Sequence, residues 1–262
     1  MPPLPPSCER RRFVLAAASA ALAASGPARA GPAGSQWQHV PGQATDIGVG
    51  GGADPVWALG VDAVRGGREI FRFDGRAQRW VQQEGGAVAI DVSPDGTPWV
   101  VTDADRIYKL EGGRWRELPG RARDIGIGAN GTVWVIGNTP ADGGFSIHRL
   151  KGNDWERVRG GAARIDVDRQ GNAWVLNTEG EIFRWNSKDW DRLPGRARDI
   201  GCGADGSVWV IGPDQERRGG HGIHRWDEGR WVKVDGAAEW ISVGPQGLPW
   251  VITAEGQIYR RV

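Results

Sequence analysis

The sequence predicts an all-β fold, a six-bladed β-propeller in which every blade is a four-stranded antiparallel sheet. The chain of 262 residues contains 42 Gly and 15 Trp. Gly, Pro and Asp-Gly pairs interrupt it so often that long helices are not expected. Six units of similar sequence follow one another, each about 35 to 43 residues long. Repeats of this size that each contain four short strands are typical of propeller blades.

Three markers recur in the same order in these units. The first is a W-x-x-[VLQ] stretch and the second an x-W-[VA] stretch, and together they hold twelve of the fifteen tryptophans. The third is an Ile followed by an aromatic or His residue and then Arg or Lys. First-marker tryptophans are Trp37, Trp80, Trp115, Trp155, Trp190 and Trp231; second-marker tryptophans are Trp57, Trp99, Trp134, Trp174, Trp209 and Trp250. We expect these twelve rings to pack between blades.

Residues 124–158 illustrate the strands expected within one blade. "DIGIG" alternates Ile with Gly, "ANG" forms a turn, and "TVWVI" is β-branched and aromatic. A loop leads to "SIHRL", "KGND" turns the chain again, and "WERV" forms the last strand. Period-two apolar spacing between Gly, Asn and Asp turns is the pattern of antiparallel strands.

The two ends of the repeat predict a closed ring. The sixth unit ends at "IYRRV" without a first-marker strand, and "QWQHV" with Trp37 stands alone before the first unit. We expect this N-terminal strand to complete the last blade, because closure removes the open edges of the sheet array. A solenoid would need capping ends, and neither end resembles one.

Alternate units differ, which predicts a pseudo-threefold ring. From second-marker Trp to third-marker Ile, odd units span 13, 13 and 14 residues, whereas even units span 8 each time. Odd units begin their first strand with Asp46, Asp124 and Asp199, and even units carry Asp91, Asp166 and Ser242 two positions further on. We therefore expect three long loops on one face of the ring.

One glycine pattern imitates a nucleotide-binding fingerprint. Gly126, Gly128 and Gly131 have the G-x-G-x-x-G spacing, and Gly201, Gly203 and Gly206 repeat it. A strand, "TVWV", follows, so no helix N-terminus is available for a phosphate. These glycines are interpreted as part of an inner strand and its turn, and no cofactor is expected.

The N-terminal segment is predicted to be a signal peptide over residues 1–30, with the propeller over residues 31–262. Three arginines at positions 10–12 precede Phe13, a short apolar run and Ala28-Arg29-Ala30. This order resembles a bacterial twin-arginine signal, with an ordinary Sec signal as the alternative. The apolar run is too short to span a bilayer. The expected location is outside the cytoplasm, periplasmic or secreted.

Charge and residue types exclude several function classes. Removal of residues 1–30 takes away four arginines and one glutamate and leaves a net charge of −2, with charges of both signs interspersed. Nucleic acid would require a basic stripe, so no nucleic-acid partner is expected.

Cys202 would be the only remaining cysteine and is interpreted as a small core residue. There is no Cys/His cluster for zinc and no G-x-S-x-G motif, so neither a metal nor a catalytic residue is predicted.

The best candidate binding residues lie at the starts of the odd units. "PGRARD" occurs twice and contributes Arg121, Arg123 and Asp124, then Arg196, Arg198 and Asp199; Asp46 holds the corresponding place in the first unit. These groups could hydrogen-bond hydroxyls or an anionic sugar, or could form structural Arg–Asp pairs instead.

Three other residues are candidates beside that motif. Trp240 breaks the repeat and could stack on a sugar ring or be an ordinary half-buried Trp. Asp91 and Asp166 are expected to line the central channel, where they could hold a cation or act in acid–base chemistry.

The repeat resembles that of the tectonin family. The likeness rests on W-x-x-[VL]-x-G, [DI]-I-x-[VI]-G, [DN]-G-x-[VP]-W and I-[YF]-R, and it covers residues 35–262 in all six units. The resemblance implies a six-bladed propeller and a lectin-like, non-catalytic role with a glycan or glycoconjugate as partner. Tectonin repeats also occur in adaptor proteins, so a scaffold that binds protein is the alternative, and a propeller lyase or glycosidase is the second alternative.

Overall fold

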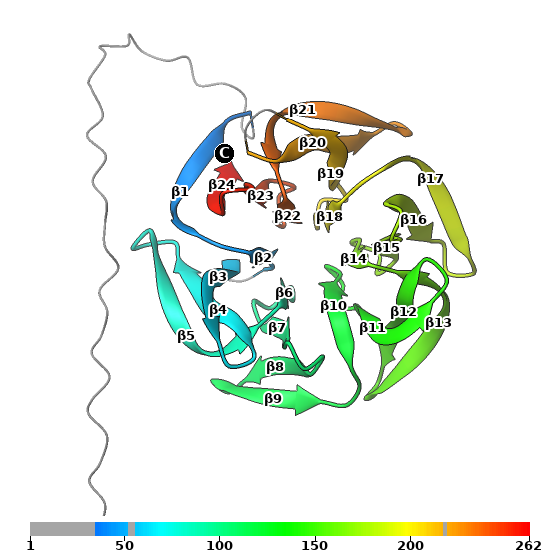
Figure 1. The fold of residues 1–262 in the computed structure, drawn as a ribbon, viewed down its shortest axis with the longest axis horizontal. Helices are drawn as coiled ribbons and strands as arrows, with labels where there is room; N and C mark the ends of the chain where they lie inside the picture. The colour runs from blue at the N-terminus through cyan, green and yellow to red at the C-terminus, as the bar shows by residue number, and fades with distance from the viewer. Residues whose placement is uncertain (1–34, 52–55, 217–218) are drawn as a thin grey trace, which may run out of the picture. The chain divides into compact units, whose positions relative to one another are not determined.

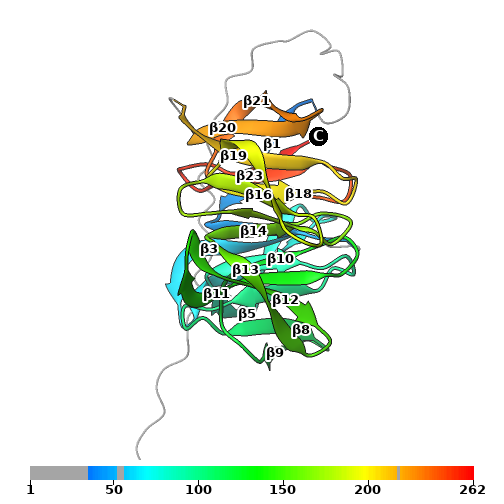
Figure 2. The ribbon, with the colours of Figure 1, turned by 90° about the vertical axis from the view of Figure 1, so that its right-hand side faces the viewer.

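The computed structural model describes residues 35–51, 56–216 and 219–262. The predicted signal peptide lies outside these residues. The described residues form six four-stranded antiparallel sheets arranged as blades around a central axis (Figure 1), which confirms the predicted fold class. In Figure 2, turned by 90°, the strands run between the two faces of this ring.

The strands of each blade follow one another from the inner strand to the outer strand. Blade 1 contains β2 (Asp46–Val49), β3 (Val56–Val64), β4 (Gly67–Asp74) and β5 (Arg79–Ala87), and blade 2 contains β6 (Ala89–Val92), β7 (Pro98–Val101), β8 (Ile107–Glu111) and β9 (Arg114–Leu118). Blade 3 contains β10 (Ala122–Ile127), β11 (Val133–Ala141), β12 (Gly144–Lys151) and β13 (Asp154–Ala162), and blade 4 contains β14 (Arg164–Val167), β15 (Ala173–Leu176), β16 (Glu181–Trp185) and β17 (Trp190–Arg196). Blade 5 contains β18 (Asp199–Cys202), β19 (Val208–Gln215), β20 (His221–Asp227) and β21 (Arg230–Ala238), and blade 6 contains β22 (Trp240–Val243), β23 (Pro249–Ile252), β24 (Gln257–Arg261) and β1 (Trp37–Gln43).

The N-terminal strand closes the ring, as predicted. Strand β1 pairs antiparallel with β24 from Trp37↔Arg261 to Val40↔Ile258. Val40 is 3% exposed and belongs to the core between blades 6 and 1. The first and last described strands therefore share one sheet.

The core consists of six apolar layers, one at each junction between neighbouring blades. First-marker tryptophans cross these junctions, because each donates its indole N–H to a backbone carbonyl at or next to the outer strand of the preceding blade. The pairs are Trp37 to Asp235, Trp80 to Pro41, Trp115 to Glu84, Trp155 to Pro119, Trp190 to Arg159 and Trp231 to Pro194, at 2.7–2.9 Å. Burying an aromatic or aliphatic side chain in such a layer contributes about 1.5–3 kcal/mol.

The long odd-unit segments are strands rather than loops. In blades 1, 3 and 5 the second strand has 9, 9 and 8 residues, whereas it has 4 in blades 2, 4 and 6. The additional residues continue the β-hairpin after a register irregularity, as between Ile136 and Pro140 in blade 3. Hairpin hydrogen bonds give these residues the backbone partners that a long loop would have lacked.

The two faces of the ring differ in the connections that they carry. The loop face carries the links between the second and third strands and the crossings from one blade to the next. The turn face carries the turns between the first and second strands and between the third and fourth strands.

The glycines of the fingerprint-like motif have structural roles around the channel. A Cβ on Gly126 would lie 2.8 Å from Asp166 Cα in the next inner strand, and one on Gly48, the equivalent glycine of blade 1, would lie 2.9 Å from Asp91 Cα. Gly131 has a φ of +79° in the following turn. Close approach of inner strands and a left-handed turn thus account for the spacing.

We predict that Gly126→Ala destabilises the propeller by about 2 kcal/mol or more, because the new methyl group would force two inner strands apart. Gly75→Ala is the matched control, since a Cβ there meets nothing within 4 Å. Chemical denaturation of both variants measures the difference. Equal midpoints would contradict the close-packing explanation.

Candidate functional site

The predicted aspartates lie in the central channel and join neighbouring blades. Each inner strand supplies a side-chain oxygen that accepts a hydrogen bond from a backbone N–H of the next inner strand. The acceptor and donor residues are Asp46 and Ile90, Asp91 and Ile127, Asp124 and Ile165, Asp166 and Cys202, Asp199 and Ile241, and Ser242 and Val49, at 2.6–3.0 Å. These six bonds form a continuous belt around the axis.

The five belt carboxylates resist ionisation. Burial, together with the charges of Asp124 and Asp199, raises the pKa of Asp46 to about 8. Burial also raises the pKa of Asp166 to about 8. It raises the pKa of Asp199 to about 7, against the opposing charge of Arg164. Desolvation of closely spaced carboxyl groups is the physical cause.

Arg164 and Trp240 occupy the loop-face end of this channel. Arg164 Nη1 lies 4.0 Å from Asp124 Oδ2, and the guanidinium carbon lies 4.2 Å from the centre of the Trp240 ring. The guanidinium thus covers one face of the indole, in cation–π geometry. Trp240 is half-buried, and that face is unavailable to a sugar ring in this arrangement.

The four predicted arginines are exposed and contact groups other than the aspartates that accompany them in sequence. Arg121 and Arg196 donate to backbone carbonyls, Gly120 O at 2.8 Å and Glu179 O at 3.0 Å. Arg123 stacks on Phe145 at 3.9 Å, and Arg198 Nε lies 3.7 Å from Glu239 Oε2. The "PGRARD" motif therefore separates into rim arginines and a channel aspartate.

Two large cavities lie on the loop face at equivalent junctions. Cleft 1/2, between blades 1 and 2, has a volume of about 410 Å³ and includes Arg65, Thr102, Arg106, Tyr108 and Trp115. Cleft 5/6, between blades 5 and 6, has a volume of about 540 Å³ and includes Trp37, Thr253, Glu255, Gln257 and Tyr259. Each cleft thus combines a Tyr and a first-marker Trp with hydrogen-bonding side chains.

The corresponding junction between blades 3 and 4 has a different lining. Phe183 stands where the clefts have Tyr, and Glu181 stands where they have Arg106 and Gln257. Glu181 accepts a hydrogen bond from Asn177 Nδ2 at 2.8 Å and forms an ion pair with Arg192. The Glu181 carboxylate is therefore paired within the protein. In cleft 1/2, Arg106 and the Tyr108 hydroxyl are also paired, both with Glu117 at 3.4 and 3.1 Å, so the difference between the junctions lies in the residue types.

Sequence reasoning does not identify the clefts. Tyr108 and Tyr259 are visible only as members of the third marker, where Phe and His occupy the same position in other units. Aromatic rings beside hydroxyl, amide and charged groups can hold a polyhydroxylated ligand by stacking and hydrogen bonding. Among the described residues, no group of three His, Cys, Asp or Glu side chains is placed to hold a metal ion. Over the same residues, no helix has the length and apolar character to cross a membrane.

Comparison with known proteins identifies both the repeat and the architecture. The Tectonin domain family model matches residues 86–174 and again residues 161–262. Tectonin-2 of Physarum polycephalum is 38% identical over 79 residues, which is 30% of this chain and only 20% of that relative.

Solved propellers are similar in fold alone. The streptogramin B lyase structure matches with a TM-score of 0.56 and 17% identity, over 86% of this chain and 96% of that one. The RRP9 WD40 repeats match with a TM-score of 0.59 and 12% identity, over 88% and 98% of the two chains.

Proposed function

Because the chain belongs to the tectonin domain family, whose propellers are lectin-like, we propose that it is an exported protein that binds carbohydrate or a cell-surface glycoconjugate through its loop face. Binding is proposed to occur without chemical conversion of the ligand. Export is proposed from residues 1–30, which lie outside the described residues.

The observation that carries this proposal is the pair of equivalent loop-face clefts. Both are large enough for one or two sugar rings and present an aromatic wall beside polar groups. Two sites on one rigid ring bind a repetitive glycan more tightly than either site alone, because the second contact is intramolecular.

The channel supports a non-catalytic role. Asp91 and Asp166 are the carboxylates on which a lyase or glycosidase would have to rely. Each accepts a backbone hydrogen bond within its own strand, from Val92 and Val167, and another from the next blade, from Ile127 and Cys202. Each of their four oxygens therefore holds one backbone N–H of the ring.

A protein partner is the second candidate, and one surface feature favours it. Val61, Val64 and Val88 are 40%, 38% and 46% exposed, and Val64 lies against Gly86, which lines cleft 1/2. Exposed apolar groups beside a cavity are common in protein-binding surfaces. A scaffold would retain its protein partner in the presence of free sugar, whereas a lectin would release its glycan.

We predict that the protein binds immobilised polysaccharide and that a combined Arg65→Ala, Arg106→Ala, Glu255→Ala and Gln257→Ala variant binds at least tenfold more weakly. These four side chains are exposed, so their truncation should change stability little. A tenfold loss corresponds to about 1.4 kcal/mol shared between two clefts. A multivalent glycan array followed by titration on the best glycan measures it.

Glu179→Ala provides the matched control, since this residue holds the position of Glu255 at the junction of blades 3 and 4. It should bind as the unmodified protein does. A total lack of glycan signal, even with multivalent display, would favour the scaffold instead.

A further inference from the structure

Asn130 and Gly131 form the only Asn-Gly pair in the sequence. They lie on the turn face of blade 3, in the turn between β10 and β11, and Asn130 is exposed. An Asn followed by Gly is chemically labile, because the backbone nitrogen of a residue without a Cβ reaches the side-chain amide carbon with little steric hindrance. The pair lines neither the loop-face clefts nor the channel.

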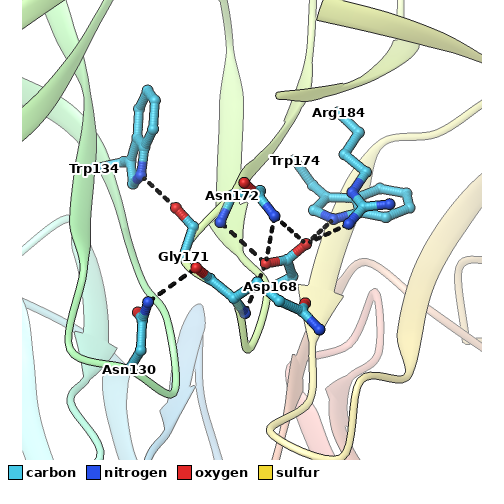
Figure 3. Close-up of polar contacts among 8 residues, drawn as sticks. Asn130, Trp134, Asp168, Gly171, Asn172, Trp174 and Arg184 are labelled. Atoms are coloured by element: carbon cyan, nitrogen blue, oxygen red, sulfur yellow. Dashed lines mark hydrogen bonds and ion pairs between the residues drawn. The ribbon is translucent and has the colours of Figure 1, made fainter. Parts of the chain in front are cut away.

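Three hydrogen bonds fix the geometry of this turn. Asn130 Nδ2 donates to Gln170 O of blade 4 at 2.9 Å, which joins the two blades (Figure 3). Thr132 N donates to Asn130 Oδ1 at 3.0 Å. Gly131 N donates to Gly128 O at 2.8 Å. The amide nitrogen, the amide oxygen and the neighbouring backbone nitrogen therefore each have a partner.

These bonds act on deamidation of Asn130 in opposite directions. The Thr132 N–H points at the oxygen on which negative charge develops when the side-chain carbonyl is attacked, so it stabilises that intermediate. The bonds to Gln170 O and Gly128 O retard the reaction, because they hold the leaving nitrogen and the attacking nitrogen. We therefore expect Asn130 to react more slowly in the folded ring than in the unfolded chain.

Equivalent turns show that the fold accepts the product of deamidation at this position. Asp95 in blade 2 and Asp205 in blade 5 stand in place of Asn130. Their Oδ1 atoms accept from Thr97 N and Ser207 N at 3.0 Å, as Asn130 Oδ1 accepts from the residue two positions further on. An aspartate lacks only the N–H for a carbonyl of the next blade, because a carboxylate cannot donate.

We propose that Asn130 is a site of spontaneous deamidation and that the change weakens the junction between blades 3 and 4. Gly131 N loses its proton to a base and bonds to Asn130 Cγ, the Cγ–Nδ2 bond breaks, and the amide nitrogen takes up a proton and leaves as ammonia. Water then opens the succinimide ring at either carbonyl and gives aspartate or isoaspartate. Both products lack the donor to Gln170 O, whereas the bond from Trp134 Nε1 to Gly171 O at 3.1 Å remains.

The test is incubation of the full chain in mildly alkaline buffer, followed by peptide mapping with mass spectrometry at several times. The rate should rise with pH, because a base must remove the Gly131 amide proton. We expect the peptide that contains Asn130 to be modified first, and to react roughly tenfold faster in urea, where the two retarding hydrogen bonds are absent. The other asparagines of the described residues should remain largely intact over the same time: Asn138, Asn153, Asn172, Asn177 and Asn186.

Three variants, with every Tm compared at one pH, connect the modification with the lost bond. Asn130→Asp should lower the Tm by about 2 °C or more, because a hydrogen bond between blades is lost. Asn153→Asp is the matched control and should leave the Tm unchanged, since Asn153 is exposed in a turn and its side chain has no hydrogen-bond partner among the described residues. Asn130→Ser cannot deamidate, so incubation should not change its Tm, whereas the Tm of the unmodified protein should fall.

Three results would overturn the inference. Modification of another asparagine before Asn130 would place the labile site elsewhere. An unmodified Asn130 in the folded protein, after the unfolded chain has reacted completely, would show that the turn prevents the reaction. Equal Tm values for Asn130→Asp and the unmodified protein would show that the junction does not depend on the Asn130 amide.

Discussion

Deletion of residues 1–40 should abolish cooperative unfolding of the propeller. The deletion removes Trp37 and Val40 from strand β1, and with them the pairing to β24 and the Trp37 hydrogen bond to Asp235 O at 2.7 Å. Each buried apolar side chain contributes about 1.5–3 kcal/mol, and β24 would become an open edge. Domains are stable by only about 5–15 kcal/mol, so this loss is large enough to open the ring.

Deletion of residues 1–30 is the control, because it retains all of β1. This shorter deletion should show a single sharp thermal transition by circular dichroism, whereas deletion of residues 1–40 should show a broad one or none. The ring-closure explanation fails if both proteins melt sharply at the same temperature.

The architecture could be predicted because its determinants repeat. Trp115 and Trp190 occupy the same place in their units, and each reaches back to the preceding blade by the same hydrogen bond. Six copies of such a signal fix the number of blades, and the missing first-marker strand in the last unit fixes how the ring closes. The turns follow from local chemistry, as with Gly131 at a φ of +79°.

The partners of the channel groups could not be predicted in the same way. Asp124 and Arg123 are adjacent in sequence, and the obvious expectation is that they act together. In the strand they point to opposite sides, so Asp124 bonds to Ile165 N of the next blade while Arg123 stacks on Phe145. Contacts between blades depend on the ring's radius and stagger, which no single repeat specifies.

The cavities could not be predicted from the sequence for a related reason. Each loop-face cleft lies at a junction where one copy of the repeat departs from another, as Arg106 and Gln257 depart from Glu181. The substitution is visible in sequence, but its meaning depends on what the Glu181 carboxylate contacts in the folded ring, which is Asn177 and Arg192. Comparison of equivalent junctions in the structure supplies this information.

Raising the pH from about 5 to about 8 should destabilise the propeller and lower its Tm by about 5 °C or more. The pKa of Asp46 and of Asp166 is raised from an ordinary value of 3.8 to about 8, and that of Asp199 to about 7, chiefly by burial. In the unfolded chain these carboxyl groups ionise near pH 4.

The protons that the folded ring retains determine whether its stability rises or falls with pH. Below about pH 4 both states keep the protons and the contribution of the belt is fully present. Between about pH 4 and pH 8 the unfolded chain binds fewer protons than the folded ring, so stability falls as pH rises, by about 1.4 kcal/mol per group and pH unit at most. Exposed acids such as Glu111 and Glu216, whose pKa values hydrogen bonds to Arg116 and Lys233 lower, act in the opposite direction at more acidic pH.

Asp46→Asn isolates the effect of one belt carboxyl group. The amide cannot ionise and keeps one oxygen to accept from either Ile47 N or Ile90 N, the two donors that Asp46 serves at 2.9 Å. This variant should be less stable than the unmodified protein at pH 5, because one bridge is lost, yet its Tm should change less between pH 5 and pH 8. Asp227→Asn, on the exposed end of β20, should leave the pH slope unchanged. Parallel Tm–pH profiles for the unmodified protein and Asp46→Asn would show that Asp46 titrates alike in the folded and unfolded states, and the belt would then be a set of permanently charged bridges.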